Sequence, residues 1–337
     1  MEQALIIVGQ GIAGSILSLR LEERGIPFKL YDDPSHSKSS RIAAGLSNPV
    51  VLKRQKWVQA AELFLPEAQK AYPLWAGQLQ KSFYHPINLE HIFHNEAEAN
   101  DWLINSDKPH LKKHLGKHIK EALSNIISPY GRGKLEGVFW VDTDSFIKAR
   151  REDLLNKGLL ISKTWTADLM DKHPNSSIIY CNGHLARQTH PMLANAFSPT
   201  KGEVMIIKAE KLPEDRILHA GVFTLPLGDK RFKIGATYNH KDLSENTSED
   251  GLSYLKAKLE SFYQGPYEVL EQFAAVRPNI KDRKPLMGRL SEHEWLFNGM
   301  GSRGVLMAPY LSQHFLNHLL SGDALQAQWD LNRFTSA

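Results

Sequence analysis

The first hydrophobic segment of the chain is followed by a glycine-rich turn and then by a helical pattern. Residues 5–8 are all apolar and predict a buried strand, and residues 12–24 have the spacing of an amphipathic helix. Beyond the helix, Phe28 and Leu30 alternate inward toward Asp32, which predicts a second strand that ends in an acid. We therefore expect one βαβ unit that opens a doubly wound sheet.

Hydrophobic periodicity also assigns elements to the rest of the chain. Residues 58–79 follow a helical pattern, and Pro66 and Pro73 predict that this helix is broken into pieces. The other expected elements are, in chain order, strands within 83–95, a short helix at 96–105, a strand, a capped helix and a strand within 137–165, a strand at 177–180, short strands of a mostly antiparallel sheet within 201–238, and a helix at about 248–263.

Strand, glycines and helix follow one another again near the end of the chain, in residues 295–322. Gly299, Gly301 and Gly304 repeat the G-x-G-x-x-G spacing. A second dinucleotide-binding unit is excluded by length, because only a short polar tail follows Gly322. We expect the N-terminus of this helix to stabilise some other electron-rich group.

The first glycine turn is typical of a dinucleotide site. Gly9 permits a sharp turn after the strand, Gly11 lets the backbone approach a pyrophosphate, and Gly14 lets the helix pack close to the sheet. Asp32, with Asp33 beside it, is placed to accept hydrogen bonds from a ribose. The unit does not distinguish FAD from NAD, and its acid argues against NADP. The alternative is that the glycines only form a tight turn.

Two further segments are candidates for contact with the same ligand. Residues 39–48 are small, polar and glycine-bearing, which allows the backbone to approach a flat ring system, and an ordinary surface loop is the alternative. The strand at 177–180 runs into Asn182 and Gly183, where either a second approach to the nucleotide or a simple turn is expected.

A basic segment, residues 108–120, places His110, His114 and His118 four residues apart, on one face if the segment is helical. Gly116 interrupts such a helix, and no carboxylate accompanies the histidines. We therefore predict no metal site and a solvated basic face, with a docking patch for an acidic partner as the remaining possibility.

Composition limits the class of protein. The 337 residues are 42% hydrophobic, which is enough for a sizeable core and two domains, and a formal net charge of +4 permits but does not demand binding to nucleic acid. The single cysteine, Cys181, excludes an internal disulfide and suits a reducing compartment. The first residues do not resemble a signal segment, so we expect a soluble, cytoplasmic protein with no membrane span.

Six segments are spread over the whole chain in the order that a known protein family has. They are GQGIAG, SSRIAAGL, the strand before CNG, KIGATY, VRPNIKDRKPLMG and GMGSRGVLMAP. In this combination the sequence resembles the FAD-dependent oxidoreductases of the D-amino-acid oxidase, glycine oxidase and sarcosine oxidase superfamily. GSRG and KGEV are similar also to the oxidoreductase half of the bacterial bifunctional enzyme that finishes a modified uridine in tRNA. We expect no counterpart of the methyltransferase half of that enzyme within these 337 residues.

The resemblance implies a mixed α/β fold, in which a Rossmann-like FAD-binding domain is interleaved with a substrate domain built on a mostly antiparallel sheet. The FAD-binding domain is expected to comprise residues 1–57, 138–200 and 276–337. The substrate domain is expected to comprise residues 58–137 and 201–275.

The resemblance also implies where non-covalent FAD is held. The ADP half, the ring system and the pyrimidine edge of the ring would contact three groups of residues. These are Gly9, Gly11, Ile12, Ala13, Gly14, Asp32 and Asp33; Ser40, Arg41, Ala43, Ala44, Gly45 and Leu46; and Gly301, Ser302, Arg303, Gly304, Val305 and Leu306, with Gly183 as a further nucleotide contact.

Four residues are implied in catalysis. Arg277 matches the arginine that grips a substrate carboxylate, with an ion pair to Asp282 as its alternative role. Lys233 lies where sarcosine oxidases carry a lysine that assists dioxygen, but a surface lysine on an edge strand is the favoured interpretation. Tyr238 is a candidate pocket wall, and Arg303 belongs to the turn at the pyrimidine edge.

Three functions remain open. The first is hydride transfer from the carbon next to the nitrogen of a small amine or amino acid onto flavin, followed by imine hydrolysis, with dioxygen or another acceptor taking the electrons. The second is processing of the carboxymethylaminomethyl group of a tRNA uridine, with the basic segments 53–56 and 108–120 on phosphates. The third is a flavin-binding subunit that depends on a partner.

Overall fold

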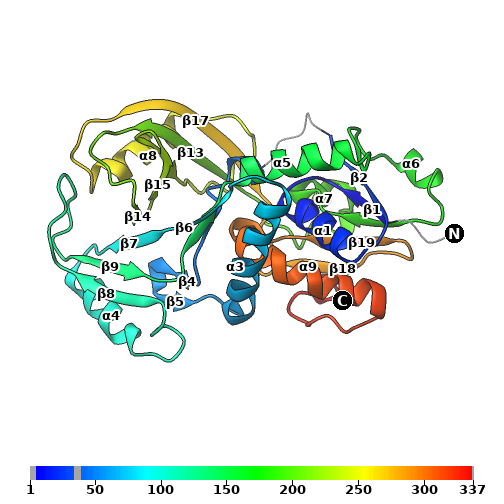
Figure 1. Ribbon diagram of the computed structural model, residues 1–337, viewed down its shortest axis with the longest axis horizontal. Coiled ribbons are helices and arrows are strands. Elements are labelled where there is room, and N and C mark those ends of the chain that lie inside the picture. Colours follow the sequence, from blue (N-terminus) through cyan, green and yellow to red (C-terminus); the bar gives the residue numbers. More distant parts are fainter. Residues whose placement is uncertain (1–4, 34–38, 336–337) are drawn as a thin grey trace.

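The computed structural model describes residues 5–33 and 39–335. The molecule has two halves, each built on one large sheet. Figure 1 shows β1, β2 and β19 in one half and β13, β15, β7 and β9 in the other. Both halves are drawn from separate stretches of the sequence. The expected interleaving of a nucleotide-binding fold with a second, mostly antiparallel sheet is therefore confirmed, and the exact domain boundaries stay a prediction.

The first sheet has six strands, five of them parallel, and begins with the predicted βαβ unit. Its edge strand β18 runs antiparallel to β19. In spatial order the strands are β11 (Leu160–Ile161), β2 (Phe28–Tyr31), β1 (Leu5–Val8), β12 (Ser177–Tyr180), β19 (Glu294–Asn298) and β18 (Leu286–Arg289).

The central strands of this sheet are buried on both faces. One face is covered by α1 (Ile12–Glu23), α5 (Thr143–Asn156) and α9 (Gly304–Ser321), and α3 (Ala61–Gln78) packs against α9. The other side carries α6 (Ala167–Asp171), α7 (Ala186–Thr189) and η3 (Pro191–Leu193), which contribute to a second apolar cluster.

The second sheet has eight strands and is antiparallel except for one pair, β14 with β7. Helix α8 (Glu249–Glu260) packs on β13 and β16, and α4 (Glu96–Ser106) packs on β8 and β9. In spatial order the strands are β17 (Glu268–Arg277), β13 (Thr200–Lys208), β16 (Arg231–Gly235), β15 (Phe223–Gly228), β14 (Arg216–His219), β7 (Asn88–Ile92), β9 (Arg132–Leu135) and β8 (Leu115–Ile119).

Short elements connect the two halves. A small sheet of three strands and a strand pair lie in the segments that pass between them. The three-stranded sheet consists of β3 (Leu46–Ser47), β10 (Phe139–Val141) and β6 (Tyr84–Pro86), and the pair consists of β4 (Val50–Val51) and β5 (Lys56–Trp57). The remaining short helices are α2 (Ser39–Ile42), η1 (Leu52–Arg54), η2 (Gly183–Leu185), η4 (Gly301–Arg303) and α10 (Asn332–Thr335).

One expectation about local structure is wrong, and one open question is settled. Helix α3 is continuous, although Pro66 and Pro73 lie within it. Its apolar face is buried against α9 and the core, and this packing outweighs the two lost backbone hydrogen bonds. Residues 115–119 form strand β8, so the three histidines of the basic segment do not share a helix face.

The packing of α1 depends on the glycine at its first turn. A Cβ atom at Gly14 would lie 2.0 Å from the carbonyl oxygen of Gly9, inside van der Waals contact. Gly77, in the last turn of α3, is the opposite case, because a Cβ there would meet nothing within 4 Å.

We expect Gly14→Ala to lower the midpoint of thermal unfolding, because α1 has to move away from the turn that follows β1. Gly77→Ala is the matched control and should leave the midpoint unchanged or raise it, since alanine favours a helix by roughly 0.5–1 kcal/mol over glycine. Equal effects of both changes in thermal unfolding would contradict this account.

Candidate functional site

A single large cavity brings together residues of both sheets. Its volume is about 1410 Å³, which exceeds the roughly 300–1,000 Å³ of ordinary small-molecule sites. One side of the cavity is lined by the carboxyl ends of β1 and β2, the segment after α2, and the N-terminal ends of α1 and α9. Strands β13 to β17 and the start of α4 line it on the other side.

The nucleotide end of the cavity is built by the βαβ unit. Asp32 accepts a hydrogen bond from the backbone N–H of Gln10 at 2.9 Å and is paired with Arg151 at 2.8 Å. Asp33 accepts a hydrogen bond from the hydroxyl of Thr164. Both acids line the cavity. Arg151, on α5, was missed by sequence reasoning because only the fold brings it to β2.

Helix α1 has no capping side chain of its own, since Gly11 is its N-cap residue. The hydroxyl of Ser40, from α2, accepts a hydrogen bond from the N–H of Ile12 at 3.0 Å. The backbone N–H groups and the positive end of the dipole at a helix N-terminus attract an anionic group. Gly9, Gly11, Ile12 and Ala13 line the cavity, whereas Gly14 lies behind them.

The segment after α2 forms a wall of the cavity in which three of the four residues are small. Ala43, Ala44 and Leu46 line the cavity together with Gly45, where a Cβ would lie 1.8 Å from the carbonyl oxygen of Val141. Arg41 is not part of the wall. Its guanidinium pairs with Asp144 of α5 at 2.6 Å, on the exposed side.

Lys233 supports this wall from behind. Its ammonium group donates to the carbonyl oxygens of Ile42 and Ala43, at 3.3 and 3.1 Å, and burial lowers its pKa. Strand β16 lies between β13 and β15, so the expectation of a surface lysine on an edge strand is wrong. Lys233 itself does not line the cavity.

The N-terminal end of α9 lines the cavity next to that of α1. Residues 301–305 line the cavity, and Leu306 is buried in the core behind them. Arg303 donates to the carbonyl oxygen of Asn48 at 3.2 Å, and burial lowers its pKa. A Cβ at Gly304 would lie 3.0 Å from Ile12, so the first turns of α9 and α1 meet here. Gly183, at the end of β12, lines the same region.

Arg277 lies over the backbone of β13. A Cβ at Gly202 would be 2.0 Å from its guanidinium, which donates to the carbonyl oxygen of Thr237 at 3.2 Å. The ring of Tyr238 stacks on it at 4.3 Å, and burial lowers the pKa of Arg277. Asp282 pairs with Arg333 at 2.8 Å, so the alternative ion pair for Arg277 is not formed.

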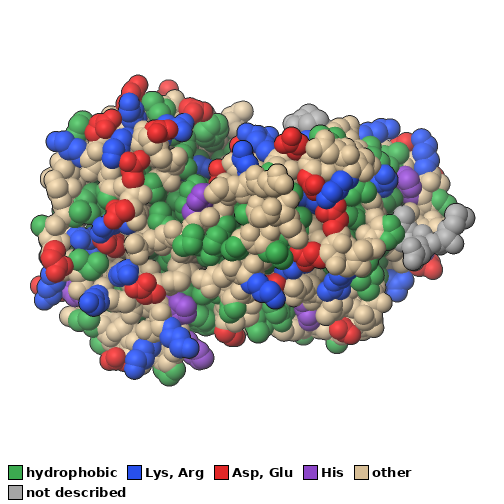
Figure 2. Space-filling view, viewed as in Figure 1, with side chains coloured by type: hydrophobic (Ala, Val, Ile, Leu, Met, Phe, Trp, Pro, Cys, Tyr) green, Lys and Arg blue, Asp and Glu red, His purple; other side chains and the backbone are tan. Residues whose placement is uncertain are grey.

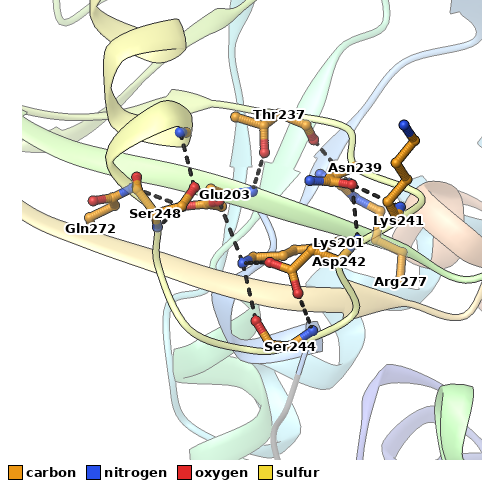
Figure 3. Close-up of polar contacts among 11 residues, drawn as sticks. Lys201, Glu203, Thr237, Asn239, Lys241, Asp242, Ser244, Ser248, Gln272 and Arg277 are labelled. Atoms are coloured by element: carbon orange, nitrogen blue, oxygen red, sulfur yellow. Dashed lines mark hydrogen bonds and ion pairs between the residues drawn. The ribbon is translucent and has the colours of Figure 1, made fainter.

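A polar network fixes the loop that carries Tyr238 (Figure 3). Lys201 is buried and donates to Asp242 at 2.5 Å, while its backbone N–H donates to the carbonyl oxygen of Asn239. Glu203, also buried, accepts hydrogen bonds from Ser248. These ties hold the aromatic ring over Arg277. Sequence reasoning missed them, because nothing in the local pattern marks two charges in a strand as buried.

The far end of the cavity carries a chain of histidines. His219 and His91 approach through their Nδ1 atoms at 3.0 Å, and Nε2 of His91 is 2.9 Å from the carboxylate of Glu98. His94 binds the other oxygen of that carboxylate. Burial alone would raise the pKa of Glu98, but the hydrogen bonds from His91 and His94 lower it to about 2. Burial lowers the pKa of His219 to about 3.

The basic segment offers no metal site. His114 and His118 are within hydrogen-bond distance of the backbone carbonyls of Glu136 and Tyr130, at 3.2 and 3.0 Å. Over residues 5–33 and 39–335 no cluster of histidine, cysteine and acidic side chains has the arrangement of a metal site. Cys181 is buried, which raises the pKa of its thiol.

Most of the chain matches a known protein family. A model described as FAD dependent oxidoreductase matches residues 4–316. The chain belongs to this family. Glycine oxidase from Pseudomonas putida is 24% identical over 357 residues, which cover 96% of this chain and 95% of the relative.

A second type of relative is longer. The tRNA 5-methylaminomethyl-2-thiouridine biosynthesis bifunctional protein MnmC from Marinobacter nauticus is 21% identical, and the match covers 94% of this chain but 55% of the relative. The chain thus spans about half the length of that protein.

Solved structures agree on the fold. Iminodiacetate oxidase from Chelativorans sp. BNC1 has a TM-score of 0.78 at 16% identity, with 98% of each chain covered. Glycine oxidase from Bacillus cereus also has a TM-score of 0.78, at 17% identity, with 96% of each chain covered. At such identities the likeness establishes the fold alone.

The cavity of this FAD-dependent enzyme fits its cofactor. The N-terminus of α1, whose N-cap residue has no side chain, suits a pyrophosphate, and the carboxylates at the end of β2 suit a ribose. The small residues at 43–45 leave room for a flat ring beside the backbone. In the part of the chain that the structure describes, no helix is long and apolar enough to cross a bilayer. Positive and negative side chains are interspersed on the face drawn in Figure 2.

We predict that the Glu98 carboxylate stabilises the fold less as the pH falls. Its folded pKa of about 2 lies below the ordinary 4.5, so its contribution is complete above about 4.5 and is lost toward 2. The difference in unfolding free energy between the wild type and Glu98→Gln should shrink over that range, measured by urea unfolding. Exposed Glu96, on the same helix turn, provides the control variant Glu96→Gln. If the difference in unfolding free energy between the wild type and Glu98→Gln does not change with pH, the lowered pKa of Glu98 is contradicted.

Proposed function

We propose that this FAD-dependent oxidoreductase oxidises a small amine or amino acid that carries a carboxylate next to the amine-bearing carbon. The arrangement of Arg277 and Arg303 carries the proposal. Each guanidinium faces the cavity and donates to a backbone carbonyl, and neither forms a salt bridge with a carboxylate among the described residues. Burial disfavours the charge of both, so an anionic substrate group would restore the lost solvation.

The proposed reaction removes a hydride from the carbon next to the nitrogen, and water hydrolyses the resulting imine to a carbonyl compound and an amine. FAD, when bound, supplies the hydride acceptor, and dioxygen or another acceptor takes the electrons. Arg277 would hold the carboxylate in two parallel hydrogen bonds and so orient the substrate, while Tyr238 covers the guanidinium.

Residues 301–305 contribute through their backbone. Residues 301–303 precede α9, and Gly304 and Val305 begin its first turn, whose N–H groups and dipole favour negative charge. Lys233 would act as a positioning residue, because it holds the carbonyls of Ile42 and Ala43 rather than facing the cavity.

The experiment that tests the proposal is an anaerobic visible spectrum of the purified protein, recorded before and after adding glycine, sarcosine, D-amino acids or proline. Loss of the flavin absorbance with one of these compounds is the expected result. A flavin spectrum that none of them changes would contradict the proposal.

Arg277→Gln should raise the KM for the substrate about 10- to 100-fold, because a charge-assisted hydrogen bond contributes about 1.5–3 kcal/mol. Arg289→Gln is the matched control, since Arg289 is exposed and lies outside the cavity. The measurement is steady-state kinetics with flavin content determined for each variant. An unchanged KM in Arg277→Gln would exclude the carboxylate contact.

A second candidate function is the processing of a carboxymethylaminomethyl group on a tRNA uridine. The observation that favours it is the position of Lys53 and Arg54, which are exposed and line the cavity. Two cations at this site suit the phosphates of a large substrate. The test is the affinity for bulk tRNA as a function of salt concentration. Binding that weakens with salt, and that Lys53→Gln with Arg54→Gln reduces, supports this function, and absence of binding at low salt removes it.

A further inference from the structure

Helix α9 carries a proline close to its N-terminal end. A helical residue normally donates its backbone N–H to the carbonyl oxygen four residues earlier, and Pro309 has no N–H to donate. The carbonyl oxygen of Val305, in the first turn of α9, therefore lacks this partner within the helix. The ring of a proline also crowds that carbonyl. The interrupted turn is the one that lines the cavity at Gly304 and Val305.

A buried tyrosine on another helix supplies the missing hydrogen bond. The hydroxyl of Tyr72, on α3, donates to the carbonyl oxygen of Val305 at 2.9 Å. Tyr72 is completely buried, and burial raises the pKa of its hydroxyl, which therefore stays protonated at neutral pH. Its ring packs against Trp75, Phe139 and Phe146. These neighbours fix the ring, so the hydroxyl is held in place for the carbonyl.

A second side chain supports the same part of α9. Arg20, on α1, donates to the carbonyl oxygen of Pro309 at 3.3 Å, and the hydroxyl of Ser312 donates to the same oxygen at 2.9 Å. Tyr72 and Arg20 do not line the cavity. They cannot act by touching a ligand there, so any effect on the site has to pass through the position of the first turn of α9.

The first turn of α9 is where a small change of position alters the field in the cavity. Its free backbone N–H groups and the positive end of the helix dipole favour negative charge. Negative charge near the ring of a flavin is one of the factors by which a protein tunes its electronics. A buried carbonyl oxygen without a donor in this turn would add the negative end of a dipole. The hydroxyl of Tyr72 offsets that charge at Val305.

We propose that Tyr72 is a positioning residue for the flavin. Its hydroxyl replaces the N–H that Pro309 lacks, which keeps the first turn of α9 in place at the cavity and makes bound FAD easier to reduce. This inference rests on the part of the proposed function in which residues 301–305 face the flavin. It does not depend on which substrate delivers the hydride.

The test measures the midpoint potential of the flavin in the purified holoenzyme, by anaerobic reduction beside a reference dye and without an amine. Tyr72→Phe removes only the hydroxyl. We expect the reduction equilibrium to shift about two- to fivefold toward oxidised flavin, which lowers the potential by about 10–20 mV for a two-electron couple. Tyr310→Phe is the matched control, because Tyr310 follows Pro309 on α9 and does not line the cavity.

A second substitution separates the hydrogen bond from a loss of packing. Pro309→Ala restores a backbone N–H that can donate to the carbonyl oxygen of Val305, so the hydroxyl of Tyr72 is no longer needed. Tyr72→Phe should therefore change the potential much less in the Pro309→Ala protein than in the wild type. Equal changes in the two proteins would overturn the role of the hydroxyl.

Ser302→Asp distinguishes this inference from the proposal on which it rests. Ser302 lines the cavity just before α9, and a carboxylate there should lower the potential if residues 301–305 face the flavin. If Ser302→Asp lowers the potential and Tyr72→Phe does not, the role of Tyr72 is wrong and the position of α9 beside the flavin stands. If neither substitution changes the potential, that position is wrong, and this inference fails with it.

Discussion

The structure depends on the meeting of two helix N-termini at one cavity. Helices α1 and α9 come from opposite ends of the sequence, and their first turns touch where Gly304 faces Ile12. Both helices direct backbone N–H groups and the positive end of a dipole toward the same space. Arg277 and Arg303 add two desolvated positive charges. The cavity therefore attracts anionic groups at several points, which suits a pyrophosphate and a carboxylate.

Much of this arrangement can be predicted from the sequence. The glycine turn after β1, the acids at the end of β2 and the small residues at 43–46 lie where the pattern places them. These features are local, because a turn or a helix N-terminus is determined by a few adjacent residues. The resemblance supplied the FAD-dependent family, which the comparisons confirm.

The remaining features depend on contacts between distant segments, and periodicity does not report them. Lys233 has the appearance of an edge-strand residue until β13 and β15 are placed on either side of it. His219 and His91 are far apart in sequence and become neighbours only through the one parallel pair of the second sheet. Helix α3 shows the same effect in reverse, since buried packing keeps it continuous across two prolines.

The central claim is that the two arginines recognise a carboxylate beside the amine that is oxidised. The most direct test compares N-methylglycine with its primary amide under anaerobic conditions, at equal concentrations and at a pH where both amines are partly neutral. The account predicts that the acid removes the flavin absorbance and that the amide, which lacks the charge, reduces the flavin far more slowly. Equal rates for the two compounds would contradict it.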